Sequence, residues 1–314
     1  MRILITGGFG FVGGRIAAHL AQAGHQVVLG SRNTTITPAW LPKAEVAKIE
    51  WNDDVSLERI CDGVDIVIQA AGMNAQDCAA DPVAALNCNG VATSRLLVNA
   101  NRAGVKNFIY LSTAHVYANP LVGDITEETC PRNLHPYATS HLAGENAILG
   151  AKQYGKIQVA VLRLSNAFGV PMHKDVRCWA LLTNDLCRQA VQTRKLVLQT
   201  NGLQKRDFIG LAEVCHAVEY IAVGTKAPLK TGVFNVGTGM SLSVIEMAQL
   251  IQQRSIQILG FEPILQCLEN CTGEDSPELN YRTDKLATLG VYFDHMGNTA
   301  ELDKLLRYSQ QHFQ

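Results

Sequence analysis

Apolar and polar positions follow two different periods along the first half of the chain. Short apolar runs predict strands at 2–6, 26–30, 46–50, 65–70, 107–112 and 158–164. Residues 83–103 and 138–153 repeat their apolar positions with helical spacing, which predicts helices between the strands. Continuously apolar strands separated by helices are typical of a parallel sheet with helices on both faces. The predicted fold class is therefore α/β with a doubly wound parallel sheet.

The first strand runs directly into a glycine-rich turn, Arg2-Ile-Leu-Ile-Thr-Gly-Gly-Phe-Gly-Phe-Val-Gly13. A Cβ atom in such a turn would fill the space through which a pyrophosphate approaches the backbone, and the N–H groups that open the next helix attract anions. That helix, from about Gly13 to Ala23, and the strand at 26–30 complete a βαβ unit of the Rossmann type. We therefore expect a dinucleotide to contact Gly7, Gly10, Phe11, Val12 and Gly13.

The alternation of strands and helices changes after residue 164. A helix near 212–223 and a short strand at 233–236 follow, but the C-terminal stretch has no clear alternation. We expect a dinucleotide-binding domain at 1–164, which also receives about 208–236. Residues 165–207 and 237–314 would then form a smaller lobe for the substrate.

The end of the second strand indicates which dinucleotide is bound. NAD sites typically have an acidic residue there, which accepts hydrogen bonds from the adenosine ribose 2′-hydroxyl. This chain has Gly30-Ser31-Arg32-Asn33 instead. The Ser31 hydroxyl and the Arg32 guanidinium suit a 2′-phosphate, which a carboxylate would repel. The predicted cofactor is NADP(H); the alternative is that Arg32 is a solvated surface cation and that NAD(H) also binds.

Composition and charge exclude several classes of protein. The formal net charge is −1 and there is no long run of like charges, which argues against nucleic acid or an anionic membrane as partner. No apolar run approaches the length of a membrane span or a signal peptide, so we expect a cytoplasmic protein. The nine cysteines are scattered without a Cys-x-x-Cys pair, which predicts reduced thiols and no metal site.

Several short motifs follow one another in an order and spacing that resemble a known family. They are Thr6–Gly13, Asp65–Gly72, Asn87–Gly90, Gly104–Thr113, Val116-Tyr117, Tyr137–His141 with Ala143–Glu145, Arg163-x-x-Asn166, Arg206–Phe208 and Asn235–Gly239. The chain resembles the extended short-chain dehydrogenases/reductases, of the NAD(P)-dependent epimerase/dehydratase kind that includes UDP-galactose 4-epimerase. The resemblance implies a Rossmann domain holding NAD(P), a C-terminal lobe holding a substrate that is often a nucleotide sugar, and a homodimer through the helices near 83–103 and 138–153.

The resemblance also assigns further residues to the cofactor. Those expected around the adenine, the turn after the fourth strand and the next helix are Glu50, Trp51, Ala70, Ala71, Gly72 and Asn87, together with Tyr137 and His141. Each of them has ordinary packing as its alternative role.

By the same resemblance, Tyr137 is the general acid or base and Thr113 hydrogen-bonds the reacting oxygen, with Ser112 as the alternative. The family has a lysine four residues after the tyrosine, whereas this chain has His141. A lysine favours the phenolate through its fixed charge and also holds the nicotinamide ribose. A histidine holds the ribose but is mostly neutral at pH 7, so the tyrosine stays a phenol. A phenol still donates a proton, which predicts a ketoreductase.

Substrate contacts are the next expectation from the resemblance. Asn166 and Arg206 match positions that contact the nucleotide sugar, with the arginine on the diphosphate. The alternative for Arg206 is a structural ion pair with Asp207 or a neighbour. Asn74 is a further candidate for the substrate, as is Thr113. Residues 272–275, Thr-Gly-Glu-Asp, stand where many members carry a second arginine for the diphosphate.

The sequence thus predicts an NADP-dependent oxidoreductase that reduces, or epimerises through, a keto group on a nucleotide-linked sugar. Two alternatives remain open. One is a dinucleotide-binding protein with weak or no catalysis, because His141 replaces the lysine. The other is a reductase of a small ketone or aldehyde without a nucleotide.

Overall fold

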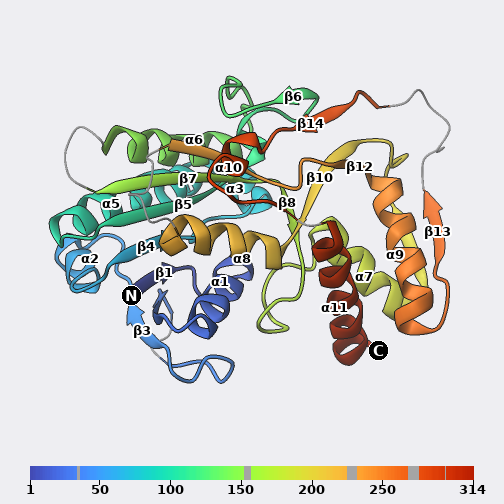
Figure 1. Cartoon of the computed structure of the whole chain (residues 1–314), viewed down its shortest axis with the longest axis horizontal. Helices are drawn as coiled ribbons and strands as arrows, with labels where there is room; N and C mark the ends of the chain where they lie inside the picture. The colour runs from blue at the N-terminus through green and yellow to red at the C-terminus, as the bar shows by residue number, and fades with distance from the viewer. Residues whose placement is uncertain (34–35, 152–156, 225–231, 268–275, 294) are drawn as a thin grey trace. The chain divides into compact units, whose positions relative to one another are not determined.

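The computed structural model describes residues 1–33, 36–151, 157–224, 232–267, 276–293 and 295–314, and the chain forms two compact units (Figure 1). The first unit comprises Met1–Ala118, Cys130–Leu164 and Cys215–Phe234, and the second comprises Asn119–Thr129, Ser165–Val214 and Asn235–Gln314. Residues 119–129 lie in the second unit, whereas the sequence-based division assigned them to the first. The reason is β6 (Gly123–Ile125), which pairs with β14 (Leu279–Tyr281).

The first unit is built on a seven-stranded sheet in the order β11-β7-β5-β4-β1-β2-β3. Its strands are β1 (Arg2–Thr6), β2 (Gln26–Ser31), β3 (Glu45–Lys48), β4 (Ile66–Gln69), β5 (Asn107–Thr113), β7 (Gln158–Leu164) and β11 (Gly232–Val236). Neighbouring strands from β7 to β3 pair in parallel. These seven strands match the predicted runs to within one or two residues at each end.

The order of the strands reverses at β1, which lies between β2 and β4. In open α/β sheets, ligands bind beside the carboxyl ends of the strands at such a switch point. The glycine turn after β1 and the Ala70–Gly72 turn after β4 therefore lie at the edge where a cofactor is expected. This sheet with helices on both faces is a Rossmann-type fold, as predicted.

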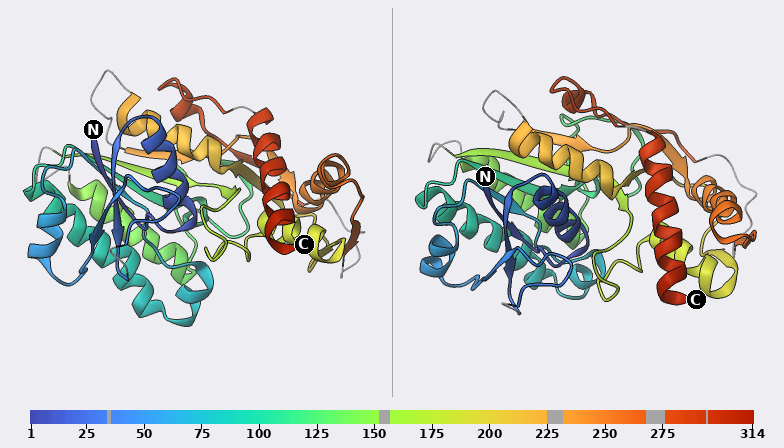
Figure 2. Two further views of the ribbon diagram at one scale, coloured as in Figure 1. Left: turned by 90° about the horizontal axis from the view of Figure 1, so that it is seen from below. Right: turned by 60° about the horizontal axis from the view of Figure 1, so that its bottom comes forward.

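Helices cover both faces of this sheet (Figure 2). One face carries α1 (Phe11–Gln22) and α8 (Leu211–Glu219), which are joined by His19 Nε2 and Glu219 Oε2 at 2.7 Å. The other face carries α2 (Asp54–Ile60), α5 (Ala92–Arg102) and α6 (Pro136–Gly150). There Leu57, Leu96 and Ile148 pack with strand residues in one buried cluster. The buried face of α5 explains the helical spacing of apolar residues there, whereas the buried face of α6 includes the polar residues Ser140, His141 and Glu145.

The predicted helix at 83–103 consists of three segments. They are α4 (Pro82–Ala85), the wide π turn η1 (Leu86–Val91) and α5. A π turn rotates the residues after it relative to a regular α-helix, and such turns are frequent at functional sites. Here η1 packs closely against α6, because a Cβ atom on Gly144 would lie 2.6 Å from the Asn89 carbonyl oxygen.

Shorter segments of the chain were not predicted from its sequence. They are α3 (Ala75–Ala80), the single turn η2 (Ala114–Val116) and the π turn η4 (Tyr220–Gly224), which continues α8. The predicted helix at 138–153 begins two residues earlier, and its last two residues lie outside the described ranges.

The second unit contains three small sheets and several helices. Its remaining strands are β8 (Asn166–Phe168), β9 (Lys195–Leu198), β10 (Lys205–Gly210), β12 (Ser241–Ser243) and β13 (Ile264–Cys267), and its helices are α7 (Leu182–Thr193), α9 (Val244–Leu259), α10 (Asp284–Ala287) and α11 (His295–Phe313). β10 pairs with β8 in parallel and with β12 antiparallel, while β9 pairs with β13.

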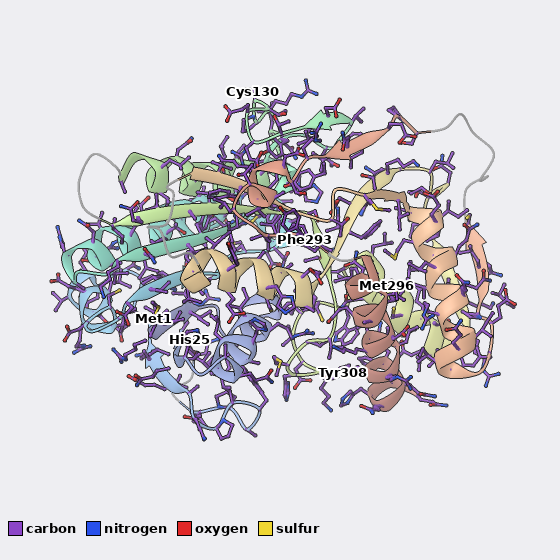
Figure 3. All side chains as sticks on the ribbon, viewed as in Figure 1. Met1, His25, Cys130, Phe293, Met296 and Tyr308 are labelled. Atoms are coloured by element: carbon purple, nitrogen blue, oxygen red, sulfur yellow. The ribbon has the colours of Figure 1, made fainter. Side chains whose placement is uncertain are left out.

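The helices α7, α9 and α11 enclose the apolar core of this unit with Leu186, Met247 and Leu305. On α11, Tyr308 (labelled in Figure 3) stacks on Trp179 with ring centroids 6.2 Å apart. Among the described residues, no helix combines the length and the apolar character that a membrane span requires.

Candidate active site

The turn between β1 and α1 depends on its glycines. Gly7 has a φ of +64°, and a Cβ atom there would lie 2.8 Å from the Ala70 carbonyl oxygen. A Cβ atom on Gly13 would lie 2.4 Å from the Gly7 carbonyl oxygen. Gly10 is the N-cap of α1 and offers no side chain to its first-turn N–H groups, which have no acceptor within a helix. Phe11 and Val12 belong to that first turn. The residues therefore fit a pyrophosphate at this helix N-terminus.

Two side chains tie the carboxyl ends of β1 and β4 together. The Thr6 hydroxyl donates to Gln69 Oε1 and accepts a hydrogen bond of 3.3 Å from the Ala71 N–H. Ala70 and Ala71 are half-buried and Gly72 is exposed. The turn after β4 is therefore held beside the glycine turn, where the sequence placed it.

The residues predicted around the adenosine end lie at the end of β2 and just after β3, and they have different surroundings. Ser31 ends β2 and is half-buried, while Arg32 is exposed. The charge of Arg32 lowers the pKa of Cys88, although burial has the larger effect and raises it. Glu50 forms an ion pair with Lys48 at 2.8 Å, and Trp51 packs against the apolar cluster under α2 and α5.

The segment Asn87–Gly90 presents two asparagines. Asn87, the predicted cofactor contact, is exposed on η1. Asn89 is fully buried, accepts a hydrogen bond of 2.9 Å from the Met73 N–H and donates one of 3.0 Å to Ser140 Oγ. Asn89 therefore joins the turn after β4 to α6, a role that the sequence did not indicate because it depends on the π turn.

Tyr137 and Thr113, the residues that the sequence proposed for catalysis, are joined by a side-chain hydrogen bond. Thr113 ends β5, and Tyr137 lies in the first turn of α6, where the His135 ring nitrogen accepts from the Tyr137 N–H at 3.2 Å. Burial raises the pKa of the Tyr137 hydroxyl, and a hydrogen bond with Thr113 opposes this effect. Tyr137 is therefore a phenol at neutral pH, which suits a proton donor.

His141 lies one helical turn beyond Tyr137, and their ring centroids are 4.6 Å apart at 70°. Only 7% of His141 is exposed, and burial lowers its pKa to about 4. The imidazole is therefore neutral at pH 7 and adds no positive charge beside the tyrosine. Its Nδ1 atom lies 2.9 Å from the hydroxyl of Tyr110 on β5.

Ser112, the alternative to Thr113, is hydrogen-bonded to a buried ion pair. Its hydroxyl donates to Glu145 Oε1 at 2.5 Å, and Arg163 Nη2 lies 2.6 Å from Glu145 Oε2. The guanidinium also lies over the Tyr117 ring, 4.5 Å from its centroid. The sequence motifs contained Glu145 and Arg163, but no local signal showed that they pair.

In the second unit, the side chains near Arg206 show whether it pairs with Asp207, which is the alternative that the sequence left open. The Asp207 carboxylate accepts from Ser165 Oγ at 2.6 Å and from the N–H groups of Thr238 and Gly239 at 3.0 and 2.8 Å. Arg206 donates instead to Gln204 Oε1, at 2.8 and 3.2 Å, and is half-buried. Within the described ranges, no ion pair joins Arg206 to Asp207.

The other expected substrate residues have local partners. Asn166 donates to the Asp207 backbone carbonyl at 3.0 Å. Asn74 caps α3, accepting from the Asp77 N–H at 2.9 Å and donating to the Asp77 carboxylate at 2.8 Å. Residues 272–275 lie outside the described ranges. The described residues include no group of three or more His, Cys, Asp or Glu that could hold a metal ion.

Curated relatives with sugar-nucleotide names match most of the chain. The dTDP-6-deoxy-L-talose 4-dehydrogenase (NAD(P)(+)) of Kitasatospora kifunensis is 30% identical over 265 residues, which cover 81% of this chain and 79% of the relative. The putative UDP-glucose 4-epimerase of Methanocaldococcus jannaschii is 29% identical over 255 residues, covering 80% and 81%.

Solved structures and a family model agree with these relatives. The structure of the UDP-glucose 4-epimerase of Thermus thermophilus in complex with NAD matches this chain with a TM-score of 0.80 at 21% identity. The match covers 99% of this chain and 100% of the epimerase chain, and at this identity it shows the fold alone. The model described as the NAD dependent epimerase/dehydratase family matches residues 3–237. The chain therefore belongs to the NAD-dependent epimerase/dehydratase family, a family of enzymes.

Proposed function

We propose that this protein is an NADP(H)-preferring oxidoreductase that reduces, or epimerises through, a keto group on a nucleotide-linked sugar, with Tyr137 as the general acid. The observation that carries the proposal is the hydrogen-bonded pair of Tyr137 and Thr113 at the carboxyl edge of the Rossmann sheet. Reduction of a ketone needs a hydride, which the nicotinamide supplies when bound, and a proton for the new hydroxyl.

The chain's own residues supply the proton and its orientation. Burial raises the pKa of Tyr137, so the phenol keeps its proton until a carbonyl oxygen develops negative charge beside it. The proposed role of the Thr113 hydroxyl is to hydrogen-bond the same oxygen. Since His141 is neutral, it does not favour the phenolate at pH 7, which supports proton donation by Tyr137 as its main role.

The proposed cofactor contacts follow from the same edge of the sheet. The glycine turn takes the pyrophosphate, and Ala70, Ala71, Gly72 and Asn87 line the cofactor from the β4 and η1 side. Ser31 and Arg32 favour the 2′-phosphate of NADP(H), and the exposure of Arg32 leaves its guanidinium accessible to that group. Glu50 and Trp51 are the proposed adenine contacts.

Arg206 and Asn166 are the proposed contacts to the nucleotide sugar in the second unit. Burial lowers the pKa of Arg206, and its guanidinium has an amide oxygen instead of a carboxylate as partner. A diphosphate would supply the missing negative charge through charge-assisted hydrogen bonds. The names of the relatives support this substrate class, since they include UDP-glucose and dTDP-sugar enzymes.

We also infer a homodimer through the helical segments α5 and α6. Val91 and Val98 are 51% and 48% exposed and lie seven residues apart, on one face of the η1–α5 segment. Exposed apolar residues at this spacing suit a helix-packing interface with a second copy. Light scattering at several protein concentrations tests this, and a strictly monomeric mass would contradict it.

One observation favours a second candidate function. The neutral His141 removes the fixed charge that would activate a tyrosine, so weak catalysis by a dinucleotide-binding protein is the alternative. A third candidate, reduction of a small ketone or aldehyde, has no observation that favours it over a nucleotide sugar.

The deciding experiment follows NADPH absorbance with a panel of 4-keto nucleotide sugars and a matched panel of small ketones. We expect oxidation of NADPH only with nucleotide sugars. Tyr137→Phe should lower kcat at least 100-fold, because losing a general acid costs about 10² to 10⁴-fold in rate. The control is Tyr292→Phe, since Tyr292 is 77% exposed. NADPH binding with neither NADPH oxidation on either panel nor epimerisation of a nucleotide sugar would favour the second candidate, and no dinucleotide binding would refute the proposal.

A further inference from the structure

Tyr110 is a buried tyrosine beside the proposed catalytic residues that the proposed chemistry does not use. It lies on β5, three residues before Thr113, and is 1% exposed. Its hydroxyl oxygen is 2.9 Å from His141 Nδ1, and the two rings lie 5.8 Å apart at 31°. A hydrogen bond at this distance has one proton between the Tyr110 oxygen and Nδ1. Whether Tyr110 or Nδ1 donates it therefore determines which ring nitrogen of the neutral His141 carries the imidazole proton.

A chain of hydrogen bonds with a defined direction leads to Tyr110. The Thr6 hydroxyl donates to Gln69 Oε1, which orients the Gln69 amide group. Gln69 Nε2 then donates to Thr93 Oγ1 at 2.9 Å. The Thr93 hydroxyl is also hydrogen-bonded to the Tyr110 hydroxyl. Because the Thr93 oxygen accepts from Gln69, its own proton is free to be donated to the Tyr110 oxygen.

The hydroxyl proton of Tyr110 has two acceptors within reach. One is His141 Nδ1 at 2.9 Å and the other is the Asn89 backbone carbonyl at 3.3 Å. The shorter distance is near the optimum for a hydrogen bond, whereas the longer one is weak. Burial keeps Tyr110 protonated, because it raises the pKa of this hydroxyl well above its ordinary value. The two distances therefore favour Tyr110 as the donor and Nδ1 as the acceptor.

A neutral imidazole whose Nδ1 accepts must carry its proton on Nε2. That atom faces the turn after β4: a Cβ atom built on Gly72 would lie 3.8 Å from Nε2 and 3.7 Å from Cε1 of His141. Gly72 belongs to the predicted cofactor edge of the sheet. The Nε2–H group is thus a hydrogen-bond donor at that edge.

We propose that Tyr110 is a positioning residue that holds His141 as the Nε2–H tautomer, so that the neutral imidazole donates a hydrogen bond to a hydroxyl group of the bound dinucleotide. His141 then performs the binding role of a cationic side chain without its charge. The identity of the ligand rests on the proposed function, whereas the tautomer depends only on contacts within the first unit.

The test measures the tautomer directly in nucleotide-free protein with ¹⁵N-labelled histidines, by long-range ¹H–¹⁵N correlation at about pH 7. His141→Gln identifies the resonances of His141. We expect an unprotonated Nδ1 and a protonated Nε2 in the wild-type protein. In Tyr110→Phe, which keeps the ring and removes the hydroxyl, we expect a mixture of tautomers. A wild-type spectrum with the proton on Nδ1 would overturn the proposal without any variant.

A second readout is affinity for NADPH, followed by fluorescence titration. Tyr110→Phe should weaken binding about tenfold, the size expected for one misoriented hydrogen bond. The control is Tyr281→Phe, because Tyr281 is equally buried and its hydroxyl donates to Asn235 Oδ1 at 3.0 Å in the second unit. This control should change neither the His141 spectrum nor the affinity.

The two possible failures are distinguishable. An unchanged His141 tautomer and unchanged affinity in Tyr110→Phe would refute the role of Tyr110. If the wild-type protein binds no dinucleotide, the proposed function fails. The nucleotide-free spectrum would still decide whether Tyr110 fixes the tautomer.

Discussion

Glu145 on α6 and Arg163 on β7 form an ion pair that is almost completely shielded from water. Arg163 Nη2 lies 2.6 Å from Glu145 Oε2, and Arg163 Nε lies 3.0 and 3.1 Å from the two carboxylate oxygens. Ser112 adds a third donor from β5. The pair therefore links the helix that carries Tyr137 to the two strands beside it and holds that helix in register with Thr113.

Removing Glu145 should destabilise the protein strongly. Glu145→Ala leaves the Arg163 guanidinium buried without its carboxylate, and breaking a buried pair in this way costs about 3–5 kcal/mol. Urea denaturation measures the change in the free energy of unfolding. The control Arg282→Ala disrupts an exposed pair with Asp284 and should change stability little. Equal effects of the two substitutions would contradict this account.

The buried His141 should make stability fall in mild acid. Burial lowers its pKa from 6.5 to about 4, so between these values the unfolded chain binds a proton that the folded protein does not. The free energy of unfolding is therefore unaffected by His141 above about pH 6.5 and decreases as the pH falls towards 4. The decrease is roughly 3 kcal/mol, because one pKa unit corresponds to about 1.36 kcal/mol.

The measurement compares urea denaturation of wild type and His141→Gln across this pH range. The stability difference between them should vary with pH in that window and be constant above it. His173→Gln, at an exposed histidine, serves as the control. Parallel curves for wild type and His141→Gln would show that His141 is not the titrating group.

A cation at position 141 should change the ionisation of Tyr137. In His141→Lys, an ammonium group would stand where the neutral ring now lies 4.6 Å from the Tyr137 ring. Its charge favours the phenolate, so the pKa of Tyr137 should fall and the rise of the alcohol-oxidation rate with pH, which follows formation of the phenolate, should move to lower pH. His141→Gln, which is neutral, should not move it. Loss of turnover in His141→Lys with an unmoved profile would indicate a separate role for the imidazole.

Arg32 should discriminate between the two dinucleotides. Arg32→Ala removes the proposed partner of the 2′-phosphate and should weaken NADPH binding about tenfold or more, while NADH binding stays unchanged. Lys43→Ala, at an exposed lysine of the same unit, controls for the loss of positive charge. Equal weakening of NADPH and NADH would refute the proposed preference.

Arg206 should act on binding of the nucleotide sugar. Arg206→Gln removes the charge proposed to meet the diphosphate, so KM for a nucleotide sugar should rise at least tenfold with little change in kcat. Lys205→Gln, on the same strand, is the matched control and should leave KM nearly unchanged. A fall in kcat at constant KM would contradict a role limited to diphosphate binding.

The sequence by itself determined the sheet and the glycine turn that is the proposed site for the dinucleotide pyrophosphate. The apolar run Ile3–Ile5 is buried in the parallel sheet, and Gly7 and Gly13 are required because a Cβ atom would collide with nearby backbone. Both signals are local, so the strands of the first unit appeared within one or two residues of their predicted places.

The second unit was predicted less well. Its C-terminal stretch contains α9 and α11, although the sequence showed no clear alternation there. Ser243 and Glu246 form a capping box at the start of α9, a local signal that marks this helix. For α11, helical stability comes from packing on α7 and α9, which the apolar pattern alone does not reveal.

The tertiary structure alone decided the electrostatics and partners of the site. The sequence placed His141 after Tyr137, but burial made its ring neutral and Tyr110, from strand β5, gave its Nδ1 a partner. Likewise Asn89 became the buried asparagine because η1 is a π turn. Burial and hydrogen bonds between distant segments set pKa values and tautomers, and neither follows from the order of residues in one segment.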